Sequence, residues 1–111
     1  MTQLSDTTFP PFLKWGQYKS KDEKNPNELE VEPQEIDTFE TEYSININVK
    51  IDGVEMAMPL QSFGSNNRQL LQKWQEGITK KKIQVGKKFK LRTWLGTSKN
   101  NFTIRRFELV F

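Results

Sequence analysis

The chain contains neither cysteine nor histidine among its 111 residues. Without cysteine it can form no disulfide and no thiolate metal site. Without histidine it also lacks the commonest general base and the commonest metal ligand of proteins. These two absences remove much of the chemistry of enzymes and metalloproteins, and we predict neither a metal site nor a cofactor.

Long apolar runs are missing as well. No stretch approaches the roughly 20 apolar residues of a membrane-spanning helix. The N-terminal sequence MTQLSDTTFPP lacks the basic and then apolar order of a secretory signal. We therefore expect an intracellular, cytoplasmic protein with no membrane partner. The mean hydropathy of -0.76 is low, which indicates that part of the chain is tail or loop.

Charge is nearly balanced overall but unevenly placed along the chain. The net charge is +3. Residues 20–42 contain nine acidic and two basic residues, a net charge of −7, whereas residues 61–111 contain twelve basic and two acidic residues, a net charge of +10. Such separation indicates that the basic half binds a polyanion or an acidic partner. The alternative for the lysine run at 80–82 is that it only solubilises a turn.

The clearest structural pattern is a β-hairpin over residues 43–60. Apolar residues recur at every second position up to Ile51, and Asp52-Gly53 is a favoured two-residue turn. With this turn both apolar faces coincide, which a one-residue slip would destroy. The predicted pairs are Ile51 with Val54, Val49 with Met56, Ile47 with Met58 and Ile45 with Leu60.

The rest of the pattern adds a bent strand before this hairpin and a helix and a second hairpin after it. Leu29 and Val31 alternate with glutamates until Pro33 demands a bulge or bend. Ser65 is the predicted N-cap of a helix that ends at Gly77. Two strands then follow, separated by the loop 96–101. We predict an all-β chain with one helix, in which the helix lies between strands three and four of five.

The strand that follows residue 87 is predicted to place three cations and a tryptophan on one face. Residues two apart in a strand share a face, so Lys88, Lys90, Arg92 and Trp94 lie together, opposite an apolar row. Proteins that bind single strands combine a positive groove with aromatic rings, and each stacked base contributes roughly 1–3 kcal/mol. This face is therefore predicted to be a stacking platform. The alternative is that the N-terminal arm covers Trp94.

In element order and in its interleaving of aromatic and basic residues, the chain from residue 27 to 111 resembles the single-stranded DNA-binding proteins of the OB-fold. The resemblance implies a five-stranded, partly open barrel that binds its ligand on strands two and three and through the loops joining strands 1–2 and 4–5. Residues 1–26 would then be an arm, disordered in part over residues 1–8, and residues 27–111 an OB-fold-like domain that binds nucleic acid.

The resemblance and the residues together predict a non-catalytic protein that binds single-stranded DNA largely without regard to sequence. The predicted contacts are Trp15, Asn46, Asn48, Lys50, Lys88, Lys90, Arg92, Trp94, Lys99, Phe102, Arg105 and Arg106. The two neighbouring arginines fall on opposite faces of the last strand, so a bulge there is expected to change its phase. Of Phe102 and Phe107, one is expected to be exposed.

Several alternatives stay open. The outer face of the 43–60 hairpin is at least as well explained as an ordinary solvated sheet, and Trp15 either extends the platform or plugs the barrel. RNA is the nearest variant of the ligand, because nothing recognisable reads a 2′-hydroxyl group. A different class is a protein-interaction module whose basic face docks an acidic partner. No Gly-rich phosphate loop, nucleophile elbow or metal-ligand spacing occurs, so an enzyme is not expected.

The acidic stretch has two possible positions. Laid across the basic face, it would compete with phosphates for the cations. Because Leu29, Val31 and Ile36 need burial, we expect it to form the first strand and its loop on the far side from that face.

Overall fold

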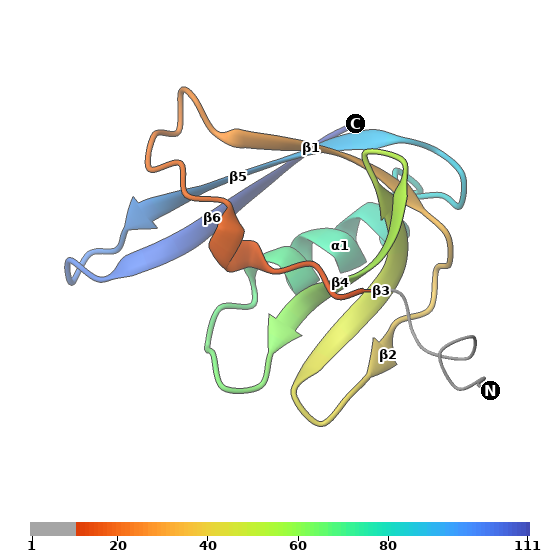
Figure 1. Ribbon diagram of the computed structural model, residues 1–111, viewed down its shortest axis with the longest axis horizontal. Helices are drawn as coiled ribbons and strands as arrows, with labels where there is room; N and C mark the ends of the chain where they lie inside the picture. The colour runs from red at the N-terminus through yellow and green to blue at the C-terminus, as the bar shows by residue number, and fades with distance from the viewer. Residues whose placement is uncertain (1–10) are drawn as a thin grey trace.

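The structure is a computed structural model that describes residues 11–111, so the disorder expected over residues 1–8 lies outside the described residues. The described chain is mostly β with one helix, as predicted (Figure 1). Its elements are the 3-10 turn Trp15–Gln17, β1 Asn27–Pro33, β2 Phe39–Glu40, β3 Ser44–Ile51, β4 Val54–Ser62, α1 Gln69–Thr79, β5 Phe89–Thr97 and β6 Thr103–Val110.

The strands form one antiparallel sheet in the order β2-β3-β1-β5-β6, with β4 paired to the other edge of β3. Six strands are present among residues 11–111 where five were predicted, so the helix lies between the fourth and the fifth. The additional strand arises because β1 and β2 pair with successive halves of one edge of β3. The chain bends at Pro33 between them, since proline has no N–H to give to a ladder.

The β3–β4 hairpin turns at Asp52 and Gly53, which both have positive φ angles of 50° and 86°. This conformation suits the Asp-Gly pair and matches the twist of the strands. Three of the four predicted pairs are confirmed, and the fourth is wrong because Ile45 lies opposite Gln61 instead of Leu60. The register shifts next to Pro59, where the ladder again lacks a donor.

The helix begins and ends later than predicted. Ser65 does not cap it; its hydroxyl accepts a hydrogen bond from the Asn67 N–H in the preceding turn, at 3.1 Å. The helix starts at Gln69 and continues through Gly77. Gly77 is buried, and a Cβ atom built on it would lie only 2.6 Å from Ile83 Cδ1. This glycine therefore provides room for packing, and the helix ends two residues beyond it.

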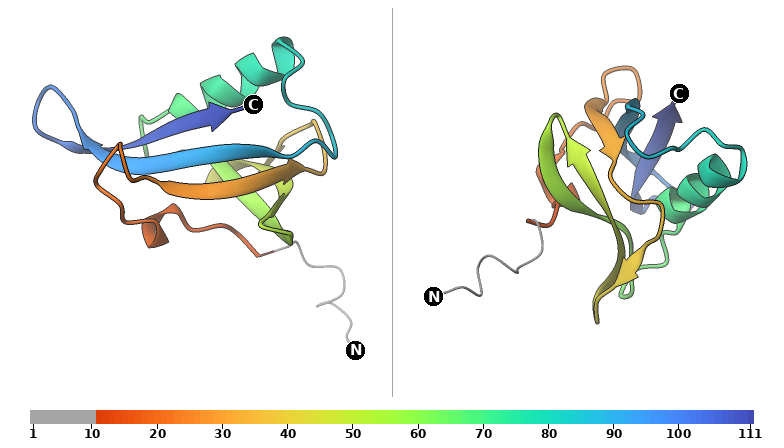
Figure 2. Two further views of the ribbon diagram at one scale, coloured as in Figure 1. Left: turned by 90° about the horizontal axis from the view of Figure 1, so that it is seen from above. Right: turned by 90° about the vertical axis from the view of Figure 1, so that its right-hand side faces the viewer.

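The core lies between α1 and the concave side of the curved sheet. Trp74 of α1 is fully buried and its ring lies 5.9 Å from the ring of Phe89. Figure 2 shows α1 along one side of the sheet and the arm of residues 11–20 along the opposite side. None of the helices in residues 11–111 is long and apolar enough to cross a membrane.

The arm joins two strands that the sheet itself leaves unpaired. Within the described chain no ladder connects β4 to β6, so the sheet is not closed. The indole N–H of Trp15 donates to the carbonyl of Pro59 in β4 at 2.9 Å, and the Trp15 ring packs at 5.0 Å against Phe107 of β6. Of the two positions considered for Trp15, the structure places it between β4 and β6, where the sheet is not closed.

Candidate nucleic-acid interface

The basic row of β5 lies beside an acidic row of β1. In the β1–β5 ladder Glu28 is opposite Arg92 and Glu30 is opposite Lys90, and directly opposed residues share a face of a sheet. The ion pairs are Lys88 with Glu30 at 3.6 Å, Lys90 with Glu28 at 3.8 Å, Arg92 with Glu28 at 3.5 Å, and Arg92 with Glu108 of β6. Three of the cations that sequence analysis selected are thus bound to carboxylates of their own chain.

The acidic stretch is therefore not on the far side from the basic face, and that expectation is wrong for its first part. Burial of Leu29 and Val31 does direct the glutamates of β1 outward, as argued from the sequence. The pairing of β1 with β5, however, makes that outward face the same one that carries the lysines. A phosphate at this row would have to displace carboxylates, although each exposed ion pair contributes only about 0–1 kcal/mol.

The distal half of the β5–β6 hairpin has a different environment. Trp94 lies opposite Arg106 on the outer face, and both side chains are half-buried. Within residues 11–111 Arg106 has no ion pair, in contrast to Arg92 two positions before Trp94. Lys99 and Phe102 are exposed in the connecting loop, Phe102 by 69%. We call Trp94, Lys99, Phe102 and Arg106 the hairpin tip, which projects at the left of Figure 1.

The backbone of the hairpin tip is held by its own hydrogen bonds. The Ser98 N–H donates to the Phe102 carbonyl at 2.8 Å, and the Phe102 N–H donates to the Ser98 hydroxyl at 3.1 Å. Asn101 takes a positive φ of 64°, which asparagine tolerates better than most residues. Gly96 gives room to the stem of Arg106, since a Cβ there would lie 3.2 Å from Arg106 Cγ. The tip therefore presents its cations and rings on a defined loop.

Arg105 connects the arm to the β5–β6 hairpin by hydrogen bonds. Its guanidinium donates to the Tyr18 carbonyl at 2.7 Å and to the Thr93 hydroxyl at 3.1 Å, and so ties the arm to the hairpin. Partial burial lowers the pKa of Arg105 below its usual value. The β5–β6 ladder is continuous from Lys90 to Thr97, so the bulge expected near the two arginines does not occur. Phe107 accordingly points into the core.

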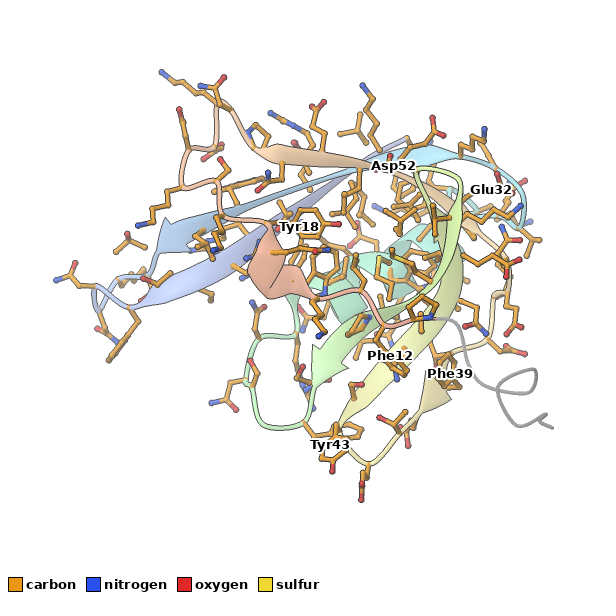
Figure 3. The ribbon with its side chains drawn as sticks, in the orientation of Figure 1. Phe12, Tyr18, Glu32, Phe39, Tyr43 and Asp52 are labelled. Carbon is orange, nitrogen blue, oxygen red and sulfur yellow. The ribbon has the colours of Figure 1, made fainter. Side chains whose placement is uncertain are left out.

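The outer face of β3 and β4 is covered rather than open. Phe39 of β2 is opposite Asn46, and Phe12 of the arm forms a parallel bridge with Ala57 of β4. Opposed residues share a face, and the two rings meet edge to face at 6.4 Å, so they lie over these strands (Figure 3). Asn46 is completely buried, and within residues 11–111 the hydrogen bonds of its side-chain amide are with Ser44.

The remaining predicted contacts on that face are not brought to the hairpin tip. Asn48 and Lys50 are half-buried in β3, and Asn48 lines a hollow with Gln34, Glu35 and Glu55. Carboxylates therefore surround this part of the sheet, which does not favour phosphate.

Lys21 is a cation near the hairpin that sequence analysis did not select. The Leu95 N–H donates to the carbonyl of Ser20 at 2.8 Å, which places Lys19 and Lys21 beside the distal half of β5. Both lysines are exposed. The contact joins segments 75 positions apart in the sequence, so no local pattern could have indicated it.

The hairpin tip combines two cations with one exposed and one half-buried ring, an arrangement suited to an anion that carries a flat ring. Residues 11–111 contain no group of three acidic, histidine or cysteine side chains that could hold a metal ion. Comparison of the chain with protein-family models, with curated proteins and with solved structures finds no match.

Proposed function

We propose that the protein is a non-catalytic binder of single-stranded DNA that uses the hairpin tip and has little sequence preference. The observation that carries the proposal is the guanidinium of Arg106, which has no ion pair within residues 11–111 and lies directly across the ladder from Trp94, with exposed Phe102 in the loop of the same hairpin. Arginine can bind a phosphate bidentately and stack on a ring. Bases of a single strand expose the faces that aromatic side chains need for stacking.

We further propose that the domain is OB-fold-like. The support is its pairing pattern: β1 lies between β3 and β5, the hairpins β3–β4 and β5–β6 flank it, and α1 connects them. In such folds the loop of the last hairpin is one of the ligand-binding loops, and here that loop carries Lys99 and Phe102. The arm occupies the seam between β4 and β6.

Duplex DNA fits the hairpin tip less well than a single strand does. Stacked base pairs hide the ring faces that Trp94 and Phe102 would contact. Helix α1 buries Leu70 and Trp74 against the sheet and offers no row of base-reading side chains for a major groove. RNA remains the variant closest to the proposal. Docking of an acidic protein on the row Lys88 to Arg92 has less support, because that row is paired with the chain's own glutamates.

The test is a fluorescence anisotropy titration of labelled single-stranded DNA, the matching RNA and the matching duplex at several salt concentrations. Arg106→Ala and Arg92→Ala form a matched pair, since both remove one arginine from the same hairpin face. We expect Arg106→Ala to weaken binding by about tenfold or more, as for loss of a charge-assisted bond. Arg92→Ala should weaken it by at most about threefold, because that cation is already paired.

Three outcomes would contradict the proposal. Equal losses in both arginine variants would show that only net charge matters. Tighter binding of the duplex would contradict stacking of bases on the rings. Absence of salt-dependent binding to any strand would contradict nucleic-acid binding itself. Tighter binding of the RNA strand would assign the same site to RNA.

A further inference from the structure

A second group of exposed rings lies at the turn between β2 and β3, away from the hairpin tip. Phe12, Thr41, Glu42, Tyr43 and Ser44 line a hollow of about 390 Å³ there. Tyr43 is 72% exposed, and Phe63, whose N–H donates to the Tyr43 carbonyl at 2.8 Å, is 49% exposed. Large apolar groups gathered in this way on a surface mark interaction sites. We call the lining residues of this hollow, together with Phe63, the aromatic hollow. Its residues Phe12 and Tyr43 are labelled in the lower part of Figure 3.

The turn that carries Tyr43 is held in place. The Thr41 hydroxyl accepts hydrogen bonds from the N–H groups of Tyr43 and Ser44, at 3.1 and 3.2 Å. The Thr41 N–H in turn donates to the Ser44 carbonyl at 2.9 Å. The tyrosine is therefore presented to solvent from a defined turn, which lowers the entropy that a ligand must remove on binding.

The segment that carries Tyr43 has charges of one sign. The sequence contains no lysine or arginine between Lys24 and Lys50. Glu35, Asp37, Glu40 and Glu42 belong to this interval, and within residues 11–111 none of them forms an ion pair. Carboxylates beside exposed rings repel phosphate and attract cations, and ring faces attract cations as well.

We propose that the aromatic hollow binds a segment of another protein in which a lysine or arginine stands next to an apolar side chain. The cation would lie over the rings beside Glu42, and the apolar side chain would cover Tyr43 and Phe63. The observations that carry this are the exposed rings, the rigid turn and the complementary charge. The proposal concerns a surface distinct from the hairpin tip and does not depend on the nucleic-acid function.

The experiment starts from a display library of short random peptides selected against the whole protein. Recovered peptides are labelled and titrated by fluorescence polarisation against the wild type and against Tyr43→Ser and Glu42→Lys. The matched controls are Val54→Ser, which removes another exposed apolar side chain, and Glu55→Lys, which makes the same charge change elsewhere. Oligonucleotide binding is measured for every variant.

We expect the recovered peptides to combine lysine or arginine with apolar residues. Tyr43→Ser and Glu42→Lys should each weaken them by roughly tenfold or more, as for central contact residues. The controls should bind peptide as the wild type does, and Tyr43→Ser should bind oligonucleotide unchanged.

Four results would overturn the inference. The first is that no peptide, or only acidic peptides, are recovered. The second is that peptide affinity does not respond to either variant at the hollow. The third is self-association of the wild type that Tyr43→Ser abolishes, because the occupant would then be a second copy of this chain. The fourth is loss of oligonucleotide binding in Tyr43→Ser, which would make the hollow part of the nucleic-acid site.

Discussion

The hairpin tip and the aromatic hollow expose aromatic rings to water in nearly equal measure, with Phe102 at 69% and Tyr43 at 72%. Their charges are opposite: Lys99 and Arg106 accompany the first, and Glu40 and Glu42 the second. Exposed rings alone therefore do not identify a ligand here. The unpaired charge beside them separates a surface suited to phosphates from one suited to cations.

The comparison also shows that charge counted along the chain overstates the charge available for binding. The acidic and basic segments have large opposite net charges, but part of each is used in the ladder between β1 and β5. Within residues 11–111, Glu28 and Glu30 are paired with Lys88, Lys90 and Arg92. Lys99 and Arg106 at the hairpin tip, and Glu40 and Glu42 at the aromatic hollow, form no such ion pair. Four changes can test whether the hairpin tip and the aromatic hollow act separately. They are given in order from the largest expected effect to the smallest.

Trp15→Ala should have the largest effect because the arm links the two surfaces. The change removes the indole hydrogen bond to Pro59 and the ring contact with Phe107. We expect the free energy of unfolding to fall by about 2–3 kcal/mol, as for truncation of a largely packed aromatic side chain. Urea unfolding followed by circular dichroism measures it. Trp15→Phe keeps most of the ring and should lose about 1 kcal/mol; equal stability of all three proteins would show that the arm packs only loosely.

Trp94→Ala tests most directly whether DNA binds at the hairpin tip and not at the aromatic hollow. Loss of one stacking ring is expected to weaken single-stranded DNA by roughly 1–3 kcal/mol, and the unfolding free energy should change by less than about 1 kcal/mol because the ring is only half-buried. Tyr43→Ala is the matched control, since it removes an exposed ring from the aromatic hollow and should leave DNA affinity unchanged. A Trp94 variant that unfolds, or that binds normally, would exclude the ring from the site.

Neutralising Glu28 and Glu30 to glutamine should strengthen DNA binding. The substitution frees the lysines and Arg92 from their ion pairs and extends the cationic surface toward the hairpin tip. We expect affinity to rise roughly threefold to tenfold, in line with the small value of each exposed pair. Glu40→Gln with Glu42→Gln makes the same change of charge at the other surface. An equal rise there would attribute the effect to the long-range field.

Lys99→Ala should have the smallest effect. It removes one exposed cation that contacts phosphate as a point charge. We expect binding to weaken by about twofold to threefold and the slope of log affinity against log salt to fall by about 0.7. Anisotropy titrations at a series of salt concentrations give both values. A loss of affinity with an unchanged slope would mean that Lys99 supports the loop and touches no phosphate.

Local patterns in the sequence predicted the parts of the fold that depend on neighbouring residues. The Asp52-Gly53 turn and the alternation around it led to three correct pairs in the β3–β4 hairpin. The alternation in β5 correctly placed Arg92 and Trp94 on the face opposite Leu91. Side chains in a strand alternate between two faces, so burial of one face is enough to direct the other outward. Leu91 lies on the buried face.

The sequence did not reveal contacts between distant segments, and these decide which predicted residues are available. Alternation directs Glu28 outward but does not say which strand lies beside it. Asn46 sits at an outward position, yet Phe39 and Phe12 come from elsewhere in the chain to cover its face. The start of the helix was also missed, because Ser65 bonds within its own turn instead of capping α1.

The free edge of β4 has a consequence for behaviour in concentrated solution. An unpaired strand edge is a template on which another chain can add. Here Ala57 exchanges both of its edge hydrogen bonds with the arm, donating to Pro11 and accepting from Leu13 at 3.0 and 2.9 Å. The arm therefore occupies the edge of β4 at Ala57 and withholds these groups from another chain. A chain from which the arm has been removed exposes these groups and should associate edge to edge more readily than the intact chain.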